Sequence, residues 1–337
     1  LEHEWTQAFR PLAGDLGRAE SAVQAAVRER GTEQGETLPF LEEAPLLTVY
    51  CATLEELEGA CMSGSDVACF EPTAGEGGGD FAGEVLEGAR MCRDAGVHFA
   101  WMWPRVAPSA FVREGLARLP GLFREGVTTV MIGETGLAEA ICARVPGIEI
   151  FGGQGLNIVN SEAALFLHPP IARFTLSPEL PYSDIAVLVP RAKIKSMEIS
   201  FEVICQGNLE AMVSRNRLLT DLLERPPYGL YGLQDETKRI FPVYEDRLGR
   251  TRVLNSVETA LVDHVPLLVG AGVRSFAIDA RRRGAAYIRA VVPAYREALD
   301  LSRAGHLDPE SLANLKERIR GVARGGLTAG NFLRPDF

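Results

Sequence analysis

Eight short apolar runs alternate with helical stretches along most of this chain, and this alternation constrains the fold more than any other feature. Strands that alternate with helices form right-handed βαβ units and a parallel sheet. Eight such strands predict closure into a (β/α)8 TIM-like barrel, and an open doubly wound sheet is the alternative. The predicted strands are residues 46–50, 66–70, 97–103, 128–132, 148–151, 172–176, 197–204 and 273–279.

Local signals mark where the predicted helices begin and end. Thr53 and Thr135 precede helical patterns and are predicted N-caps, because a threonine hydroxyl accepts a hydrogen bond from the first turn. Gly64, Gly96 and Gly126 follow helical patterns and suit the left-handed residue that ends many helices.

The spacing of the runs is regular except between the seventh and the eighth. The gap there holds aromatic and β-branched residues around an Arg-Leu-Gly-Arg turn, which predicts a β-hairpin insertion at about 228–256. Residues 1–43 are predicted to form an N-terminal helical arm. Residues 44–337 are predicted to form one α/β-barrel domain.

Composition excludes several classes of protein. In 337 residues, 46% are hydrophobic and 24% charged, which is ordinary globular usage. The formal charge of −10 argues against a protein that binds mainly to nucleic-acid phosphates.

No apolar run approaches the ~20 residues of a membrane helix, so no membrane partner is expected. Six cysteines without a Cys-x-x-Cys pair, and a start without a signal-peptide pattern, predict a cytoplasmic protein without disulfides.

The seventh predicted strand has one unusually polar face. Glu198, Glu202 and Gln206 share it, and the outward face of a barrel strand must be apolar, so this face is predicted to point into the barrel. A buried glutamate needs a partner, and Arg173, which with Thr175 lies on the sixth strand, is the predicted one. Two roles are open: a structural salt bridge that replaces part of the core, or an active-site carboxylate.

Barrel enzymes carry their reacting groups at the carboxyl ends of the strands. The polar residues found there include carboxylates, amides and arginines, although part of this set is expected to cap helices. The run Arg281, Arg282 and Arg283 either binds an anion or begins a solvated helix. The strand-end set is Cys51, Glu71, Arg105, Glu134, Asn157, Asn160, Ser161, Ser177, Glu179, Gln206, Asn208, Glu210, Asp279 and Arg281.

Several common catalytic motifs are missing from the sequence. There is no His-Glu-x-x-His pattern, and the five histidines are isolated, so a histidine-rich zinc site is not expected. There is no Gly-x-Ser-x-Gly pattern, which excludes the α/β-hydrolase nucleophile turn. The glycine-rich segments 74–81 and 152–157 lack complete nucleotide-binding fingerprints and are predicted to be loops or tight turns.

The segment FEVICQGNLEAMVSRNRLLT (201–220) resembles the signature of peptidase family U-32, the collagenase-like peptidases. Glu202, Gly207 and Leu209 fit the signature. Residues 238–282 and 323–334 resemble two further blocks of the family, the second with Asn331 in place of a histidine. Segments 103–111, 132–139, 157–164 and 175–180 are also typical of it. The resemblance covers roughly residues 44–335.

The departures from the signature are informative. Glu210 and Arg217 stand where the family has two cysteines, and no cysteine follows Cys205. Relatives that carry an iron–sulfur cluster hold it with such thiolates, so the resemblance implies no iron–sulfur cluster here. The family's assigned activities are proteolysis, including that of collagen, and oxygen-independent hydroxylation of RNA bases or quinone precursors. The cluster-dependent hydroxylases are the weaker analogy.

The resemblance implies a peptidase that acts on a peptide or protein at the carboxyl-terminal face of the barrel. Without a serine triad signature, the expected mechanism is water activated by a carboxylate, with or without one divalent metal, zinc being the first expectation. The candidate catalytic residues are Glu202, Glu179, Arg105 and Glu134. The candidate substrate-binding residues are Asn157, Asn160, Asn208, Ser214, Asn255, Asp279 and Arg281.

Two other hypotheses stay open. One is a cluster-free relative of the hydroxylases in an RNA-modifying assembly, which the arginine run favours and the net charge opposes. The other is a binding scaffold without catalysis. A homo-oligomer is compatible with all three.

Overall fold

The computed structural model describes residues 44–72, 81–224, 229–305 and 308–334. The predicted N-terminal arm, residues 1–43, lies outside the described residues.

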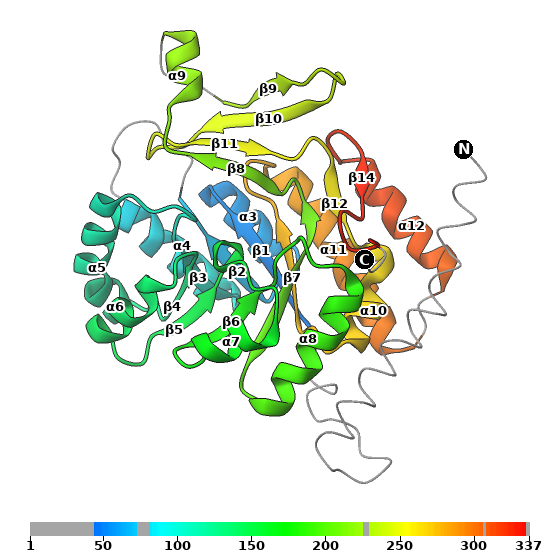
Figure 1. Ribbon diagram of the computed structural model, residues 1–337, viewed down its shortest axis with the longest axis horizontal. Coiled ribbons are helices and arrows are strands. Elements are labelled where there is room, and N and C mark those ends of the chain that lie inside the picture. Colours follow the sequence, from blue (N-terminus) through cyan, green and yellow to red (C-terminus); the bar gives the residue numbers. More distant parts are fainter. Residues whose placement is uncertain (1–43, 73–80, 225–228, 306–307, 335–337) are drawn as a thin grey trace.

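A closed barrel of eight parallel strands forms the centre of the described chain (Figure 1). The last barrel strand pairs with the first on one side and with the seventh on the other, so that Ser275 lies opposite both Leu46 and Glu202. The predicted barrel is therefore confirmed, and the open sheet is wrong. The strands are β1 (Leu46–Cys51), β2 (Val67–Phe70), β3 (His98–Met102), β4 (Thr129–Ile132), β5 (Glu149–Gly152), β6 (Ile171–Thr175), β7 (Ser200–Gly207) and β13 (Ser275–Asp279).

Helices connect the strands and cover the outside of the barrel (Figure 1). Thr53 caps the first of them with a capping box, since its hydroxyl accepts from the Glu56 N–H and Glu56 accepts from the Thr53 N–H. Thr135 occupies the N-cap position of α6 as predicted, but its hydroxyl makes no capping hydrogen bond. The helices are α3 (Leu54–Met62), α4 (Phe81–Ala95), α5 (Ser109–Arg124), α6 (Gly136–Arg144), α7 (Ser161–Leu167), α8 (Tyr182–Lys195), α9 (Leu218–Leu223), α10 (Val265–Gly270), α11 (Ala285–Arg303) and α12 (Pro309–Arg320), with short 3-10 turns η2 (Gln154–Leu156) and η3 (Val262–His264).

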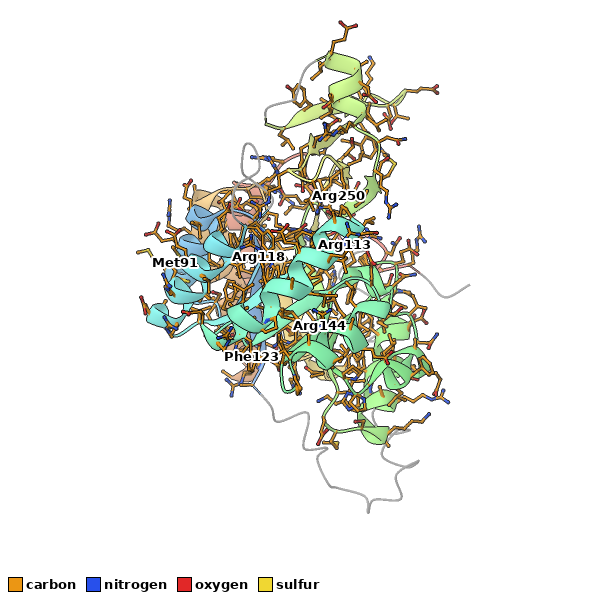
Figure 2. All side chains as sticks on the ribbon, turned by 90° about the vertical axis from the view of Figure 1, so that its left-hand side faces the viewer. Met91, Arg113, Arg118, Phe123, Arg144 and Arg250 are labelled. Atoms are coloured by element: carbon orange, nitrogen blue, oxygen red, sulfur yellow. The ribbon has the colours of Figure 1, made fainter. Side chains whose placement is uncertain are left out.

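The main core lies between the strands and these helices. Along β1, Leu47 and Val49 point outward into this core, while Tyr50 points into the barrel, as the period of a strand requires. Figure 2 shows α5 from outside, with Arg113 and Arg118 on the surface of the barrel. This division leaves the barrel interior as a separate, smaller cluster.

A four-stranded antiparallel sheet is inserted between β7 and β13. The predicted hairpin corresponds to β10 and β11, but β8 also pairs with β11, so the inserted sheet begins before residue 228. It stands above the carboxyl ends of the barrel strands (Figure 1). The strands are β8 (Glu210–Ser214), β9 (Tyr231–Gln234), β10 (Ile240–Glu245) and β11 (Thr251–Leu254), in the order β8-β11-β10-β9.

The end of β7 departs from the predicted alternation. Its register with β13 slips between Ala277 and Ile278, so Gln206 pairs with Ile278. The bulge turns Gln206 away from the barrel interior, and its amide donates to Tyr287 on α11 (3.0 Å) and to Glu258 (2.9 Å). The prediction that Gln206 shares the inward face is therefore wrong.

Two short strands complete the sheet beyond β7. The strand β12 (Glu258–Ala260) runs antiparallel to β7 and pairs with β14 (Leu327–Thr328) near the end of the described chain. Of the helices in the described ranges, none combines the length and the apolar character needed to cross a bilayer.

Candidate functional site

Acidic residues from three elements meet at the mouth of the barrel. Glu71 follows β2, Asp279 ends β13, and Glu210 begins β8. Arg281, two residues after β13, joins two of them: its guanidinium donates to both Asp279 oxygens (2.8 and 2.6 Å) and to Glu71 (2.6 Å). The carboxyl ends of the barrel strands therefore hold paired charges.

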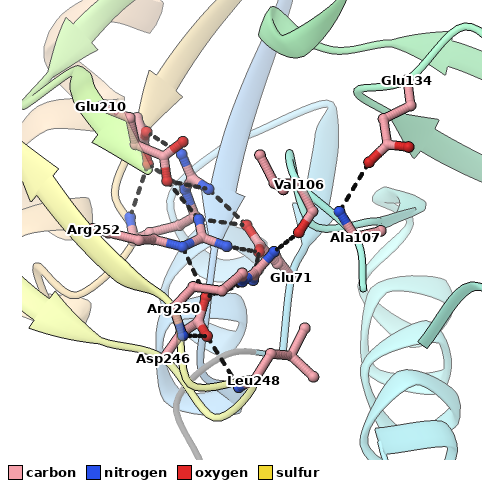
Figure 3. A network of polar contacts seen from close by, with 11 residues as sticks. Glu71, Val106, Ala107, Glu134, Glu210, Asp246, Leu248, Arg250 and Arg252 are labelled. Carbon is pink, nitrogen blue, oxygen red and sulfur yellow. Dashed lines mark hydrogen bonds and ion pairs between the residues drawn. The ribbon is translucent and has the colours of Figure 1, made fainter. Parts of the chain in front are cut away.

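The inserted sheet adds three more charged side chains to this group (Figure 3). Arg252 on β11 donates to Glu71, to Glu210 and, at 3.0 Å, to Asp246. Arg250 donates to Asp246 (2.9 Å) and to the Val106 carbonyl of the loop after β3. In the view of Figure 2, Arg250 lies where the insertion meets the barrel. The insertion is thus fastened over the barrel mouth by ion pairs.

We call this group the mouth network; it consists of Glu71, Glu210, Asp246, Arg250, Arg252, Asp279 and Arg281. Its side chains are at most 9% exposed. Ions so buried are stable only when they are paired and hydrogen-bonded, since the cost of removing them from water is large. The four carboxylates and three guanidinium groups meet that condition.

Burial alone raises the pKa of Glu210, but the positive charges of Arg252 and Arg281 outweigh it and lower that pKa to about 2. Burial raises the pKa of Asp246 as well, and Arg252 and Arg250 again outweigh it, so the pKa of Asp246 is lowered. Both carboxylates are therefore ionised throughout the physiological pH range.

The lowered pKa of Glu210 predicts acid sensitivity. Its ordinary pKa is 4.5 and its folded pKa is about 2. The contribution of Glu210 to the free energy of unfolding is therefore complete above pH 4.5 and is lost as the pH falls toward 2. This one group is expected to account for up to about 3 kcal/mol of the free energy of unfolding. Urea unfolding at pH 7, 4.5 and 3 measures this loss. Glu210→Gln is expected to be less stable at pH 7 and to show a shallower pH dependence, and an unchanged slope would contradict the assignment.

Beneath the network lies a small cavity at the centre of the mouth, of about 30 Å³. Arg105 lies at its edge and, among the described residues, makes no ion pair. A Cβ on Gly155 would lie 2.6 Å from the Gly133 carbonyl and 3.1 Å from the Arg105 side chain, so glycine is required for this close packing. The lining residues are Tyr50, Glu71, Met102, Trp103, Arg105, Met131, Ile132, Gly133, Gly153, Gln154, Gly155, Glu210 and Arg281.

Glu134 positions the loop that carries Arg105. One of its oxygens accepts the Ala107 N–H at 2.9 Å (Figure 3). Within the described chain, its other oxygen has no hydrogen-bond partner. Glu134 follows Gly133, which lines the cavity, but Glu134 itself is not a lining residue; its carboxylate holds the loop that carries Arg105.

Glu202 lies inside the barrel, fully buried, below the cavity. One oxygen accepts from Tyr50 and from Thr175 (2.9 Å), and the other from Ser275 (2.7 Å) and from Arg173 (3.5 Å). The predicted pairing with Arg173 is present and involves Glu202, whereas Glu198 is exposed. With both oxygens occupied, the arrangement favours the structural salt bridge of the two roles considered.

The other predicted residues are spread around the mouth. Glu179 and Asn157 are exposed, and Asn157 ends η2 with φ +49°. Asn160 caps α7 by accepting the Ala163 N–H (2.8 Å). Ser214 lies in the inserted sheet and accepts the Asn216 N–H. None of these four lines the central cavity.

Asn208 and Asn255 lie side by side near the end of β7. The Asn208 amide donates to the Asn255 carbonyl (3.0 Å) and its oxygen accepts from Arg283 (3.0 Å). Asn255 lines a separate cavity of about 150 Å³, together with Thr259 and Asn331. The structure therefore places Arg105 and Arg281 at the central cavity and leaves these amides to one side. Asp279 pairs with Arg281, and Glu134 holds the loop that carries Arg105.

A metal site is not evident in the described ranges, where no three His, Cys, Asp or Glu side chains are placed to hold an ion. Each carboxylate of the mouth network already contacts an arginine, so a divalent ion bound there would have to displace a guanidinium. These residues do not fit the expected zinc. At the signature position of the first cysteine, Glu210 pairs with Arg252. That the chain holds no iron–sulfur cluster stays a prediction.

Sequence reasoning did not identify Asp246, Arg250 and Arg252 as site residues. The available signal was the Arg-x-Arg spacing in a predicted strand, which places both guanidinium groups on one face, with an aspartate just before the turn. That spacing also fits a strand face that is exposed to solvent. Only the contact with Glu71 shows that these arginines belong to the site and not to such a face.

Comparison with known proteins gives one family and several structures of similar fold. The model of peptidase family U32 matches residues 110–336. The structure of the U32 peptidase Mk0906 is 11% identical, with a TM-score of 0.43, over 74% of this chain and 96% of that chain. Tryptophan synthase subunit alpha from Legionella pneumophila is 11% identical, with a TM-score of 0.38, over 90% of this chain and 98% of that chain. DHDPS from Cyanidioschyzon merolae with lysine bound is 12% identical, with a TM-score of 0.42, over 81% of this chain and 80% of that chain. No curated protein matches the sequence.

The matched region extends from α5 through the inserted sheet to the end of the described chain, and it contains the 201–220 segment and most of the mouth network. Because the family model covers well over half of the sequence, the chain belongs to peptidase family U32.

Proposed function

We propose that this chain is a peptidase that binds its substrate at the mouth of the barrel, with Arg105 as the group that contacts a peptide carbonyl or carboxylate. Family membership supports a peptide substrate. The observation that carries the proposal is that Arg105 lines the central cavity and makes no ion pair among the residues described, although its charge helps to lower the pKa of Glu210. The arginines of the mouth network, by contrast, are already neutralised by carboxylates.

Glu134 is our candidate general base. Glu202 has both oxygens occupied, Glu71 and Glu210 are paired with arginines, and Glu179 is exposed away from the cavity. Glu134 keeps one oxygen without a hydrogen-bond partner in the described chain, and it follows Gly133, which lines the cavity. A carboxylate there can take a proton from water as the water attacks the peptide carbonyl, and can then return the proton to the leaving amine. A guanidinium at the carbonyl oxygen stabilises the negative charge that develops on it.

The proposal predicts that Glu134→Gln lowers kcat by roughly 10²- to 10⁴-fold, the usual contribution of a general base. The glutamine oxygen can still accept the Ala107 N–H, so the loop and the melting temperature should be kept. Arg105→Gln should weaken binding or turnover of the same substrates. The assay follows cleavage of a mixture of gelatin peptides by mass spectrometry.

Glu139→Gln is the matched control, because Glu139 is an exposed glutamate on the neighbouring helix α6. It should cleave as the unaltered chain does. Absence of cleavage by the unaltered chain, or full activity of Glu134→Gln, would sink the proposal.

One observation favours a second candidate, a binding protein without catalysis. All four carboxylates of the mouth network are neutralised, which suits a mouth that recognises a ligand without transferring protons. Peptides that bind to the unaltered chain, lose affinity in Arg105→Gln and are never cleaved would support this second candidate.

A further inference from the structure

A second cavity lies beside the barrel mouth and is lined by four arginines. Arg281, Arg282 and Arg283 come directly after β13, and Arg324 comes after α12. They converge from two distant parts of the sequence on one small space. The remaining lining residues are Asn208, Leu230, Pro242, Tyr244, Leu254 and Asp279.

Two of the four guanidinium groups are neutralised. Arg281 pairs with Asp279 (2.6 Å) and Glu71, and Arg283 pairs with the fully buried Glu258. The Arg283 side chain is 4% exposed, and within the described ranges its Nε has no hydrogen-bond partner. These pairs fix the wall of the cavity.

Arg282 has no carboxylate partner in the part of the chain that the structure describes. Its guanidinium lies over the Tyr244 ring, 4.2 Å from the ring centre, and its buried Nε finds no hydrogen-bond acceptor among the described residues. Its φ is +61°, a conformation that costs a bulky residue energy and that is found at ligand sites. An unpaired buried N–H of this kind calls for an acceptor.

Arg324 has no carboxylate partner for its guanidinium within the same described ranges. One nitrogen donates to the Arg282 carbonyl at 3.4 Å. Partial burial and the neighbouring charge of Arg283 lower the pKa of Arg324. A bound anion would relieve this repulsion. Arg324 is exposed, so its side chain can turn outward to admit a ligand into a cavity of about 10 Å³.

We propose that these arginines bind the phosphate group of a small ligand. Arg282 and Arg324 are the two guanidinium groups of the four that make no ion pair in the described ranges, and a phosphate monoester, with a charge of about −1.5 to −2 at pH 7, can pair with both where a single carboxylate cannot. Guanidinium groups bind phosphate oxygens through paired hydrogen bonds. The loop after the last strand is also a frequent phosphate site in barrels of this kind. Arg281 lines both cavities, so the bound ligand would lie next to the barrel mouth.

Isothermal titration of the whole chain with sodium phosphate, and separately with glycerol 3-phosphate, tests the site at pH 7.5 and constant ionic strength. We expect saturable binding of at least one of them. Arg282→Gln and Arg324→Gln should each weaken it about 10- to 100-fold, as expected for loss of a charge-assisted hydrogen bond. Arg289→Gln removes an equal charge from an exposed position on α11 and should bind as the unaltered chain does.

Four results would overturn the proposal: no saturable binding of either phosphate, equal binding of acetate, unchanged binding in both variants, or an equal loss in Arg289→Gln. Binding of an RNA oligonucleotide that inorganic phosphate and glycerol 3-phosphate do not displace would assign the arginines to a nucleic acid instead. The variants lie on different segments, so a folding defect in one leaves the other as the test. None of these outcomes depends on peptide cleavage.

Discussion

Replacing Arg252 by methionine is expected to destabilise the chain by about 3–5 kcal/mol, the cost of leaving buried charges without their partner. Arg252 joins Glu71, Glu210 and Asp246, and its side chain is fully buried. Methionine fills similar space but donates no hydrogen bond. This loss is a large part of the 5–15 kcal/mol that stabilises a typical domain. Urea unfolding at pH 7 measures it.

The same variant should change its pH dependence in a defined direction. Without Arg252, burial and mutual repulsion raise the folded pKa values of the carboxylates that remain. A raised pKa gives stability at low pH that is lost as the pH rises, so the deficit of Arg252→Met should be smaller at pH 4 than at pH 7.

Two comparisons decide what the loss means. Arg239→Met removes an exposed cation from the same insertion and should change stability by no more than about 0.5 kcal/mol. The double variant Arg252→Met/Glu210→Met also removes the carboxylate that has lost its hydrogen-bonded partner and keeps only the longer ion pair with Arg281 (3.8 Å), so it should recover part of the loss. If Arg252→Met is as stable as the unaltered chain, the mouth network does not fasten the insertion.

Replacing Glu202 by glutamine is expected to have the second largest effect on stability, about 3–5 kcal/mol. Both Glu202 oxygens accept hydrogen bonds, and the carboxylate neutralises Arg173 inside the barrel. Glutamine has one acceptor oxygen and no charge, so Arg173 would stay buried and unpaired. Chemical unfolding and the melting temperature report this loss.

Glu198→Gln is the control, since Glu198 lies just before the same strand but is exposed. It should leave the free energy of unfolding unchanged within about 0.5 kcal/mol. The double variant Glu202→Gln/Arg173→Met should be more stable than Glu202→Gln alone. A Glu202→Gln chain that keeps its melting temperature and loses peptide cleavage would restore Glu202 as an active-site carboxylate.

The two ion-pair groups have different consequences for the site. The Glu202 group lies inside the barrel and holds Tyr50, whose ring forms part of the cavity lining. The mouth network holds the inserted sheet over the same cavity. Together the two groups hold the inner side and the outer side of the central cavity that Arg105 lines.

The sequence by itself determined the barrel. Period-2 alternation, regular strand spacing and the glycines that end helices are local signals; Gly64, Gly96 and Gly126 have φ values of +88°, +71° and +103°, as predicted. The parity of β7 also predicted that Arg173 pairs with Glu198 or Glu202, because inward residues on adjacent strands lie close together, and the structure pairs it with Glu202. The family signature was likewise readable from the sequence.

Only the tertiary structure decided which charged side chains at the mouth form ion pairs. Arg252 and Glu71 are 181 residues apart in sequence, and no periodicity relates an inserted sheet to the strand ends that it covers. The β7 bulge turned Gln206 outward, which a strict alternation could not foresee. Within the described ranges, Arg105, Arg282 and Arg324 make no ion pair, unlike the arginines of the mouth network, because long-range packing, and not residue type, sets the partner of a charge.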